Sequence, residues 1–252
     1  MQQPRTEEEI QAMRESGHML AEVLKLLKSK VCEGISPKEL AEIAKLELRK
    51  LGGQPAFLGV QSERGIPFPN VICISVNDQV QHSIPTNIPL EEGDVLNLDF
   101  GVRYKGMITD AGISVGVGKI SADNLRLLRG TEEALAAAVN TIQDGVRVGD
   151  VSFEIQRVLE KYKLGIVREL VGHGVGHELH EEPEVPNYGK KGTGSLLKTG
   201  MTICVEPITT LGNYKIYQES DGWTLRTADG SNSAQFEHTI LVLENGCEIL
   251  SV

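Results

Sequence analysis

An acidic residue follows a glycine by six positions, at the end of an apolar, strand-like run, once in each half of the chain. The two runs are GDVLNLD, which ends at Asp99, and GMTICVE, which ends at Glu206. Asp110, His173 and Glu237 lie in or beside other strand-like runs. Four carboxylates held together repel one another and need a compensating positive charge. The pattern therefore favours a pair of bound divalent cations and metal-assisted hydrolysis.

The order of predicted elements also repeats. Residues 6–52 and 121–165 each read as a long helix, a glycine, a short loop and a second helix, and strand-like runs follow in both halves. Matching Gly34 and Gly52 to Gly145 and Gly165 needs two extra residues in the second half. We interpret this as internal duplication, at about 6–120 and 121–252, within a single catalytic domain of residues 1–252. Coincidence between two generic runs is the alternative.

Local signals place the individual elements. Thr6 and Ser36 each begin a helix with a capping box, and Gly52 ends the second helix. In the second half, apolar residues at helical spacing predict a long helix from Leu125 to Ile142 and a further helix through Leu159.

Two apolar runs, residues 95–102 and 107–115, predict a β-hairpin. If its loop has two residues, Asp99 and Asp110 lie on the same face, directly opposite or one diagonal step apart. A loop with an odd number of residues would separate them. Asp99 lies in a run that reads as buried, and a buried carboxylate needs a partner.

The segment GHGVGHELHEEP contains three of the six histidines, at positions 173, 177 and 180. Its glycines disfavour a helix, so we do not interpret His173 and His177 as a helical zinc pair. We interpret the three acids near its proline as solvated: Glu181, Glu182 and Glu184.

Composition excludes several classes of protein. The net charge of −10 argues against a nucleic-acid binder. No secretory signal and no apolar run of membrane-spanning length is present, so we expect a cytoplasmic protein that is not bound to a membrane. We also expect a monomer. No GxSxG elbow or phosphate-binding loop occurs. The four scattered cysteines are expected to be reduced core residues: Cys32, Cys73, Cys204 and Cys247.

Five motifs occur in the order typical of type I methionine aminopeptidases: GDVLNLD, ITDAG, GHGVG with HEEP, GMTICVEP and SAQFEHT. The chain resembles this family from about Arg5 to its end, in the short bacterial-type form. The resemblance implies an α/β (α+β) pita-bread fold, in which two pseudo-symmetric halves form a central curved antiparallel sheet flanked by helices. It implies removal of the initiator methionine from nascent polypeptide N-termini, at the ribosome, when the second residue is small. It also implies two divalent ions, drawn from Co, Mn, Fe and Zn, and a bridging hydroxide that attacks the scissile amide.

By position, the resemblance implies that Asp110 and Glu237 bridge both ions. Asp99 then holds one ion, and His173 with Glu206 holds the other. Glu206 also relays a proton. The resemblance thus assigns five metal ligands in all.

His82 and His180 match family histidines that contact the substrate near the scissile amide and its carbonyl, where they would position it and stabilise developing charge. An apolar methionine pocket would consist of Phe57, Phe68, Cys73, Leu179 and Trp223. Packing in the core is an equally good interpretation of these five residues.

The chain departs from the family pattern in three places. Gln81 and Ser83 flank His82 where the family often has Cys and Gly, His177 stands where Arg is common, and residues 61–69 form a longer segment near the pocket wall. We expect these departures to affect substrate preference rather than metal binding. Two alternatives remain. One is a proline-directed dipeptidase or aminopeptidase of the same fold, although such enzymes have a histidine at the position of Glu169. The other is a catalytically silent binding protein of that fold.

Overall fold

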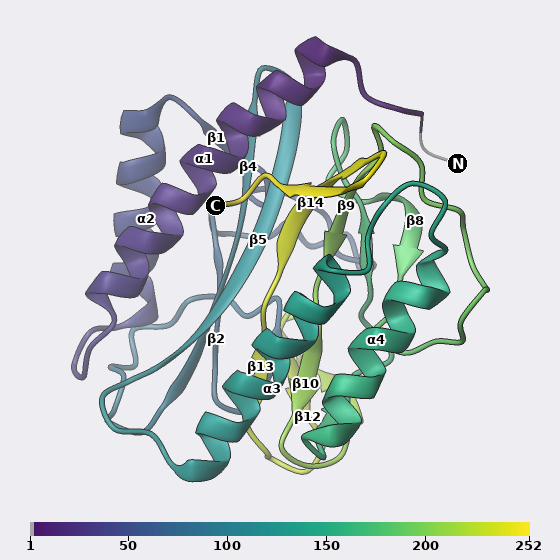
Figure 1. The fold of residues 1–252 in the computed structure, drawn as a ribbon. Coiled ribbons are helices and arrows are strands. Elements are labelled where there is room, and N and C mark those ends of the chain that lie inside the picture. The colour runs from purple at the N-terminus through teal and green to yellow at the C-terminus, as the bar shows by residue number, and fades with distance from the viewer. Residues whose placement is uncertain (1–2) are drawn as a thin grey trace.

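The structure is a computed structural model that describes residues 3–252. Strands fill its middle, and four helices pack against these strands (Figure 1). Helices α1 (Glu7–Lys30) and α2 (Pro37–Leu51) pack beside strands of the first half. Helices α3 (Ala122–Val139) and α4 (Val148–Lys161) pack beside strands of the second half.

The helix starts follow the sequence signals. The Thr6 and Ser36 side chains accept hydrogen bonds from the third residue of α1 and α2, and both capping boxes are complete. The predicted end of α3 was wrong, because the helix stops at Val139 and Ile142 lies beyond it. Tighter turns follow, with the Ile142 amide donating to the Val139 carbonyl, and they bury Ile142 outside the helix.

The first-half sheet has the order β1-β4-β2, and β5 pairs with β4. Its strands are β1 (Gln54–Pro55), β2 (Cys73–Val76), β4 (Val95–Tyr104) and β5 (Met107–Gly116). The largest sheet of the second half has the order β15-β14-β9-β7-β8. Its strands are β7 (Gly172–Gly174), β8 (Glu181–Val185), β9 (Thr202–Val205), β14 (His238–Leu243) and β15 (Gly246–Ile249).

Two smaller sheets have the orders β13-β10-β6 and β11-β12-β3. The first contains β6 (Gly165–Ile166), β10 (Ile208–Thr210) and β13 (Ser233–Gln235). The second combines β3 (Gln79–Gln81) of the first half with β11 (Ile216–Gln218) and β12 (Leu225–Thr227) of the second.

Backbone hydrogen bonds join the two halves. The Glu237 amide donates to the Gly112 carbonyl at 2.8 Å, and the Gly112 amide donates to the Glu237 carbonyl at 3.4 Å. Strand β5 therefore runs antiparallel to the chain that enters β14. The two main sheets meet along this line.

Each half has its own apolar core. Leu20 and Leu98 are fully buried in the cluster beneath α1 and α2, and Leu127 and Ile155 are fully buried in the cluster beneath α3 and α4. Full burial of such a side chain stabilises the fold by about 1.5–3 kcal/mol. A third cluster, which includes Met13, packs residues of both halves together.

Glycines with positive φ recur at matching places in the two halves. Gly34 and Gly145 precede the second helix of each half, and Gly93 and Gly200 precede the strands β4 and β9. The match of Gly52 to Gly165 was wrong, because Lys163 is the residue that adopts the left-handed conformation after α4. The spacing from Gly34 to Gly52 equals that from Gly145 to Lys163, so no insertion is needed.

All four cysteines are free, and Cys73 and Cys204 are buried. Cys247 is half-buried and Cys32 is exposed, so the expectation that all four belong to the core was wrong for Cys32. Within residues 3–252, no helix combines the length and the apolar character that crossing a membrane requires.

Candidate metal centre and cavity

The β4–β5 hairpin places Asp99 and Asp110 next to each other. Its loop has two residues, Lys105 and Gly106, whose φ angles of 48° and 83° suit a type I′ turn. Gly112 pairs with Asp99 across the hairpin, so Asp110 lies one diagonal step from Asp99 on the same face. This confirms the geometry that the sequence predicted for a two-residue loop. Both carboxylates are buried.

Glu206 and Glu237 come from neighbouring strands of the second half. Glu206 directly follows β9 and Glu237 directly precedes β14, and these strands pair through Val205 and His238. The Gln235 amide nitrogen donates to Glu206 Oε2 at 3.2 Å and to Glu237 Oε2 at 3.0 Å. One side-chain amide therefore orients both carboxylates.

Gln235 also links the two halves. Its Oε1 accepts a hydrogen bond from Asn97 Nδ2 at 2.8 Å, and Asn97 lies on β4 of the first half. Neither Gln235 nor Asn97 was predicted from the sequence. Each of them places a side-chain amide inside a run that is otherwise buried. A buried amide needs hydrogen-bond partners, and this requirement could have identified both residues.

His173 lies on β7 and presents one free nitrogen to the site. Its Nδ1 lies 3.0 Å from the Gly174 carbonyl, which can only accept, so Nδ1 carries the proton. Nε2 then keeps its lone pair and lies 3.5 Å from Glu206 Oε1. Burial lowers the pKa of His173 to about 3, so the ring is neutral. A neutral imidazole oriented in this way is a typical metal ligand.

The carboxylates form a buried cluster without a cation from the protein. Oxygen atoms of Asp99, Asp110 and Glu237 lie within 4.8 Å of one another. One oxygen of each, Asp99 Oδ1, Asp110 Oδ1 and Glu237 Oε1, has no hydrogen-bond partner among the described residues. No Lys or Arg is among the described residues that line the adjoining cavity.

Burial shifts the pKa values of these carboxyl groups upward. Desolvation raises the pKa of Asp110 to about 7, and desolvation followed by repulsion from Asp110 raises the pKa values of Asp99, Glu206 and Glu237 well above their usual range. Carboxyl oxygens that lack hydrogen-bond partners among the described residues, together with one imidazole, form a donor set that suits divalent cations. The residues present therefore fit bound divalent metal.

Ligand atoms of His173, Cys204 and Glu237 also lie within 4.8 Å of one another. The sequence analysis treated Cys204 only as a core residue, yet it lies two positions before Glu206 on β9 and faces the same side. Burial raises the pKa of the Cys204 thiol well above its usual range, and its Sγ lies 3.6 Å from Thr239 Oγ1. Cys204 therefore lies beside the candidate metal centre, although it was not among the five predicted ligands.

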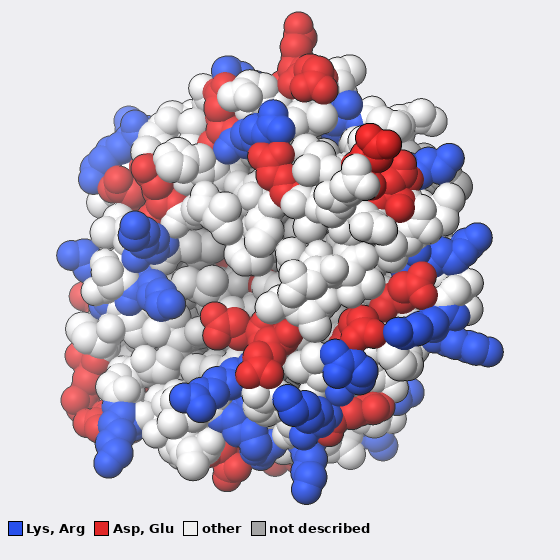
Figure 2. Space-filling model, viewed as in Figure 1, with Lys and Arg blue, Asp and Glu red and all other residues white. Residues whose placement is uncertain are grey.

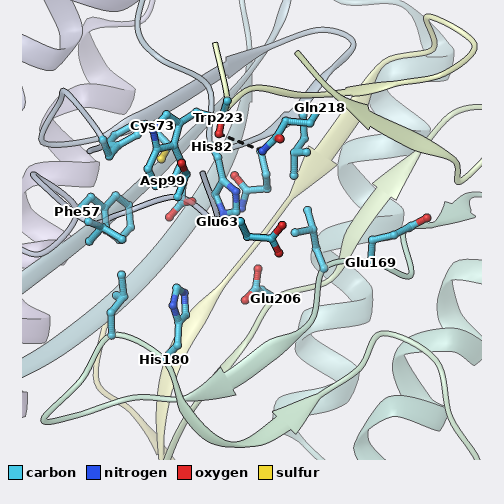
Figure 3. Close-up of a pocket in the computed structure, with 18 of the residues that line it drawn as sticks. Phe57, Glu63, Cys73, His82, Asp99, Glu169, His180, Glu206, Gln218 and Trp223 are labelled. Carbon is cyan, nitrogen blue, oxygen red and sulfur yellow. Dashed lines mark hydrogen bonds between the residues drawn. The ribbon is translucent and has the colours of Figure 1, made fainter. Parts of the chain in front are cut away.

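A cavity of about 640 Å³ opens beside these carboxylates. Phe57 and His180 lie on its wall, as do Trp223 and His82 (Figure 3). All five residues predicted for an apolar pocket line it and pack as one cluster: Phe57, Phe68, Cys73, Leu179 and Trp223. The Phe68 and Trp223 rings meet edge to face at 5.1 Å. The volume and the apolar wall suit a small side chain as ligand.

His82 adopts a left-handed backbone conformation with φ of 56°, which is uncommon outside glycine. Such strain collects at functional sites. Burial lowers the pKa of His82 to about 4, so its ring is neutral. Its neighbours are buried, and Ser83 Oγ accepts a hydrogen bond from Ser75 Oγ at 3.0 Å. The residues on either side of His82, Gln81 and Ser83, are therefore held in the core.

The ring of His180 lies 4.4 Å from that of His173, edge to face. His180 follows the turn at His177 and Glu178 and is more exposed than His82. Glu181, predicted to be solvated, is instead half-buried and paired with Arg5, whereas Glu182 and Glu184 are exposed as expected.

The longer segment between residues 61 and 69 forms a small hairpin at the cavity mouth. Gln61 bridges to Pro67, and the Ser62 amide donates to the Ile66 carbonyl at 2.9 Å. Glu63 lies near its tip and lines the cavity (Figure 3). Glu169 lines the cavity as well. On the face drawn in Figure 2, acidic and basic side chains are interspersed.

Metallopeptidase family M24 matches residues 11–244 of the chain. A methionine aminopeptidase of Clostridium perfringens is 42% identical over 248 residues, which make up 98% of each protein. A solved methionine aminopeptidase of Thermotoga maritima has a TM-score of 0.95 and 38% identity, and the match covers 100% of this chain and 99% of that one. A prolidase of Pyrococcus furiosus shares only the fold, with a TM-score of 0.78, 22% identity and coverage of 99% of this chain and 65% of that one. These similarities confirm the predicted pita-bread fold.

Proposed function

The chain belongs to metallopeptidase family M24, and we propose that it is a methionine aminopeptidase, a hydrolase that removes methionine from the N-terminus of proteins and peptides. The observation that carries this proposal is the convergence of five metal-ligand candidates beside an apolar cavity, in a chain that matches methionine aminopeptidases over nearly its whole length. A substrate with a small second residue is the expected preference.

We propose that Asp99, Asp110, His173, Glu206 and Glu237 would hold two divalent ions, with Asp110 and Glu237 as ligands that both ions would share. In support, Glu237 belongs to both groups of converging ligand atoms. Divalent ions in such a site act as Lewis acids and lower the pKa of bound water. The choice among Co, Mn, Fe and Zn depends on supply as much as on ligand type.

The protein side chains supply proton transfer and positioning. Glu206, whose pKa is raised by burial, would accept a proton from the attacking water and pass it to the leaving amine as the amide C–N bond breaks. Burial lowers the pKa values of His82 and His180, and these two histidines on the cavity wall would donate hydrogen bonds near the scissile nitrogen and to the carbonyl oxygen. The methionine side chain would enter the cluster around Phe68 and Trp223.

We infer that the physiological partners are nascent polypeptide N-termini, because initiator methionine occurs at the start of newly made chains. The place of reaction would then be the cytoplasm, at or near the ribosome, and a monomer would suffice because every candidate site residue comes from one chain.

The decisive experiment measures methionine release from a Met-Ala-Ser peptide after metal removal and after addition of each divalent ion. Release should require metal, and peptides that begin Met-Lys or Gly-Pro should be poor substrates. Faster cleavage of the Gly-Pro peptide than of Met-Ala-Ser would instead indicate a proline-directed dipeptidase or aminopeptidase. If the protein bound metal and cleaved none of these three peptides, it would be the catalytically silent binding protein.

A further inference from the structure

Arg5 is a buried cation near the start of the chain, and its guanidinium contacts the segment that carries His180. The Arg5 side chain is only 4% exposed. Its Nε donates to Thr202 Oγ1 at 3.1 Å, and its Nη2 donates to the Val175 carbonyl at 3.1 Å and to Glu181 Oε2 at 2.5 Å. Burying a guanidinium is costly unless it is paired and hydrogen-bonded, and here it is both.

Glu181 transmits this contact to the turn that precedes His180. Its second oxygen, Oε1, accepts hydrogen bonds from the His177 amide at 2.8 Å and the Glu178 amide at 3.1 Å. One carboxylate therefore holds Arg5 on one oxygen and the backbone of the turn on the other. Since His180 comes next to Glu181 in the chain, the direction of its side chain depends on this turn.

The loop is shaped to receive the guanidinium. A Cβ atom on Gly176 would lie 2.3 Å from Arg5 Nη2, so a larger residue there would displace the guanidinium from this place. The Arg5 amide also donates to the Gly200 carbonyl at 2.8 Å, immediately before the strand that leads to Glu206. Arg5 therefore fills the space between the two segments that carry His180 and Glu206.

His177 connects the same cluster to helix α1. Arg5 Nη1 lies 2.8 Å from His177 Nδ1, which must accept because the guanidinium can only donate. His177 Nε2 then donates to Glu9 Oε1 at 2.6 Å, and Glu9 also completes the capping box of α1. His177 was one of the departures from the family pattern, and this contact gives it a structural role.

We propose that Arg5 is a positioning residue for His180. The N-terminal segment, through Arg5 and Glu181, fixes residues 175–181 so that the His180 ring faces the substrate carbonyl. This inference rests on the proposed function for its effect on turnover, but the loop restraint itself does not. Loss of Arg5 leaves Glu181 without this cation and frees the turn, and a small displacement of a positioned group can lower turnover by about a hundredfold.

The test compares Arg5→Ala with Arg14→Ala. Arg14 lies on α1 and forms a two-pronged ion pair with Glu248 on β15, at 2.8 Å for each contact, away from the His180 loop. In the metal-loaded protein, amide hydrogen exchange over residues 175–181 should rise in Arg5→Ala, rise less in Arg5→Lys and stay at the wild-type level in Arg14→Ala. Unchanged exchange in folded Arg5→Ala would overturn the proposal.

Kinetics then separate positioning from general destabilisation. We expect kcat for Met-Ala-Ser to fall about tenfold to a hundredfold in Arg5→Ala, with a smaller change in KM. In a His180→Ala background the Arg5→Ala change should lower kcat no further, because coupled residues are not additive. Equal losses in both backgrounds would contradict positioning through His180. If the wild type released no methionine, the proposed function would fail, while the exchange measurement would still decide the loop restraint.

Discussion

Thr239 Oγ1 accepts a hydrogen bond from the Asp110 amide at 2.8 Å and donates one to the Asp110 carbonyl at 2.7 Å. A single buried hydroxyl thus satisfies both backbone groups of Asp110 from the other half of the chain. The Asp110 carboxylate remains directed at the candidate metal centre, with Oδ1 unpartnered among the described residues. The seam between the halves therefore fixes the position of this carboxylate.

Replacing a shared carboxylate should abolish hydrolysis. We expect Asp110→Ala or Glu237→Ala to lower metal-dependent kcat/KM by about a thousandfold or more, because each removes a ligand from both proposed ions and thus several kcal/mol of transition-state stabilisation. Asp123→Ala, which removes an exposed carboxylate that pairs with Arg126, is the control. Full activity in either ligand variant would refute the two-ion arrangement.

Gln235→Ala should weaken metal binding without removing a ligand. The variant loses the amide that orients Glu206 and Glu237, and such supporting contacts are typically worth 10–100-fold in affinity, so a loss of about that size is expected by titration calorimetry. Gln156→Ala removes a half-buried amide on α4 that contacts Glu160 and the Gly189 backbone, and it should leave metal affinity unchanged. Equal affinities for both variants would show that Gln235 does not orient the ligands.

His82→Ala should lower kcat by about 10²–10⁴ while metal content stays the same, because His82 is expected to contact substrate rather than metal. The left-handed backbone at this position also strains alanine, whereas asparagine tolerates it. His82→Asn therefore separates loss of the imidazole from backbone strain, and it should be as inactive as His82→Ala. Metal loss in His82→Asn, measured by elemental analysis, would place His82 among the ligands.

Metal-free protein should lose thermal stability as pH rises from about 7.5 to 8.5. Burial raises the pKa of Asp110 to about 7 and those of Asp99, Glu206 and Glu237 well above their usual range, so the folded state holds protons that the unfolded state releases. The stabilisation that comes from these bound protons is greatest at low pH. It declines as the pH rises, until the pH exceeds the pKa values of the folded state. Burial lowers the pKa values of His82, His173 and His238, which adds a slope of opposite sign near pH 6.5, and this slope becomes small above pH 7.5 because unfolded-state histidine is then largely neutral.

Bound metal should remove this decline, since a divalent ion stabilises the ionised carboxylates and binds the folded state preferentially. Thermal melts at several pH values, with chelator and with manganese or cobalt, measure both effects. A melting temperature of the chelated protein that increases steadily from about pH 7.5 to 8.5 would contradict the raised pKa values.

The sequence by itself determined the local features of this protein. Thr6 and Ser36 cap the helices because their side chains bond to amides three residues away. The sequence predicted the hairpin but left its loop length open, and the structure shows the two-residue loop that places Asp99 and Asp110 on one face. The motifs also identified the family and the fold. The internal duplication and the roles of the site residues stay predictions.

Only the tertiary structure decided how distant groups meet. Gln235 connects three polar side chains of both halves, Arg5 lies against a loop about 170 residues away, and Glu181 is paired rather than solvated. Lys163, not a glycine, takes the left-handed position after α4. Local signals depend on hydrogen bonds to near neighbours, which sequence spacing shows directly. Burial and pairing depend on packing between remote segments, and spacing alone does not contain that information.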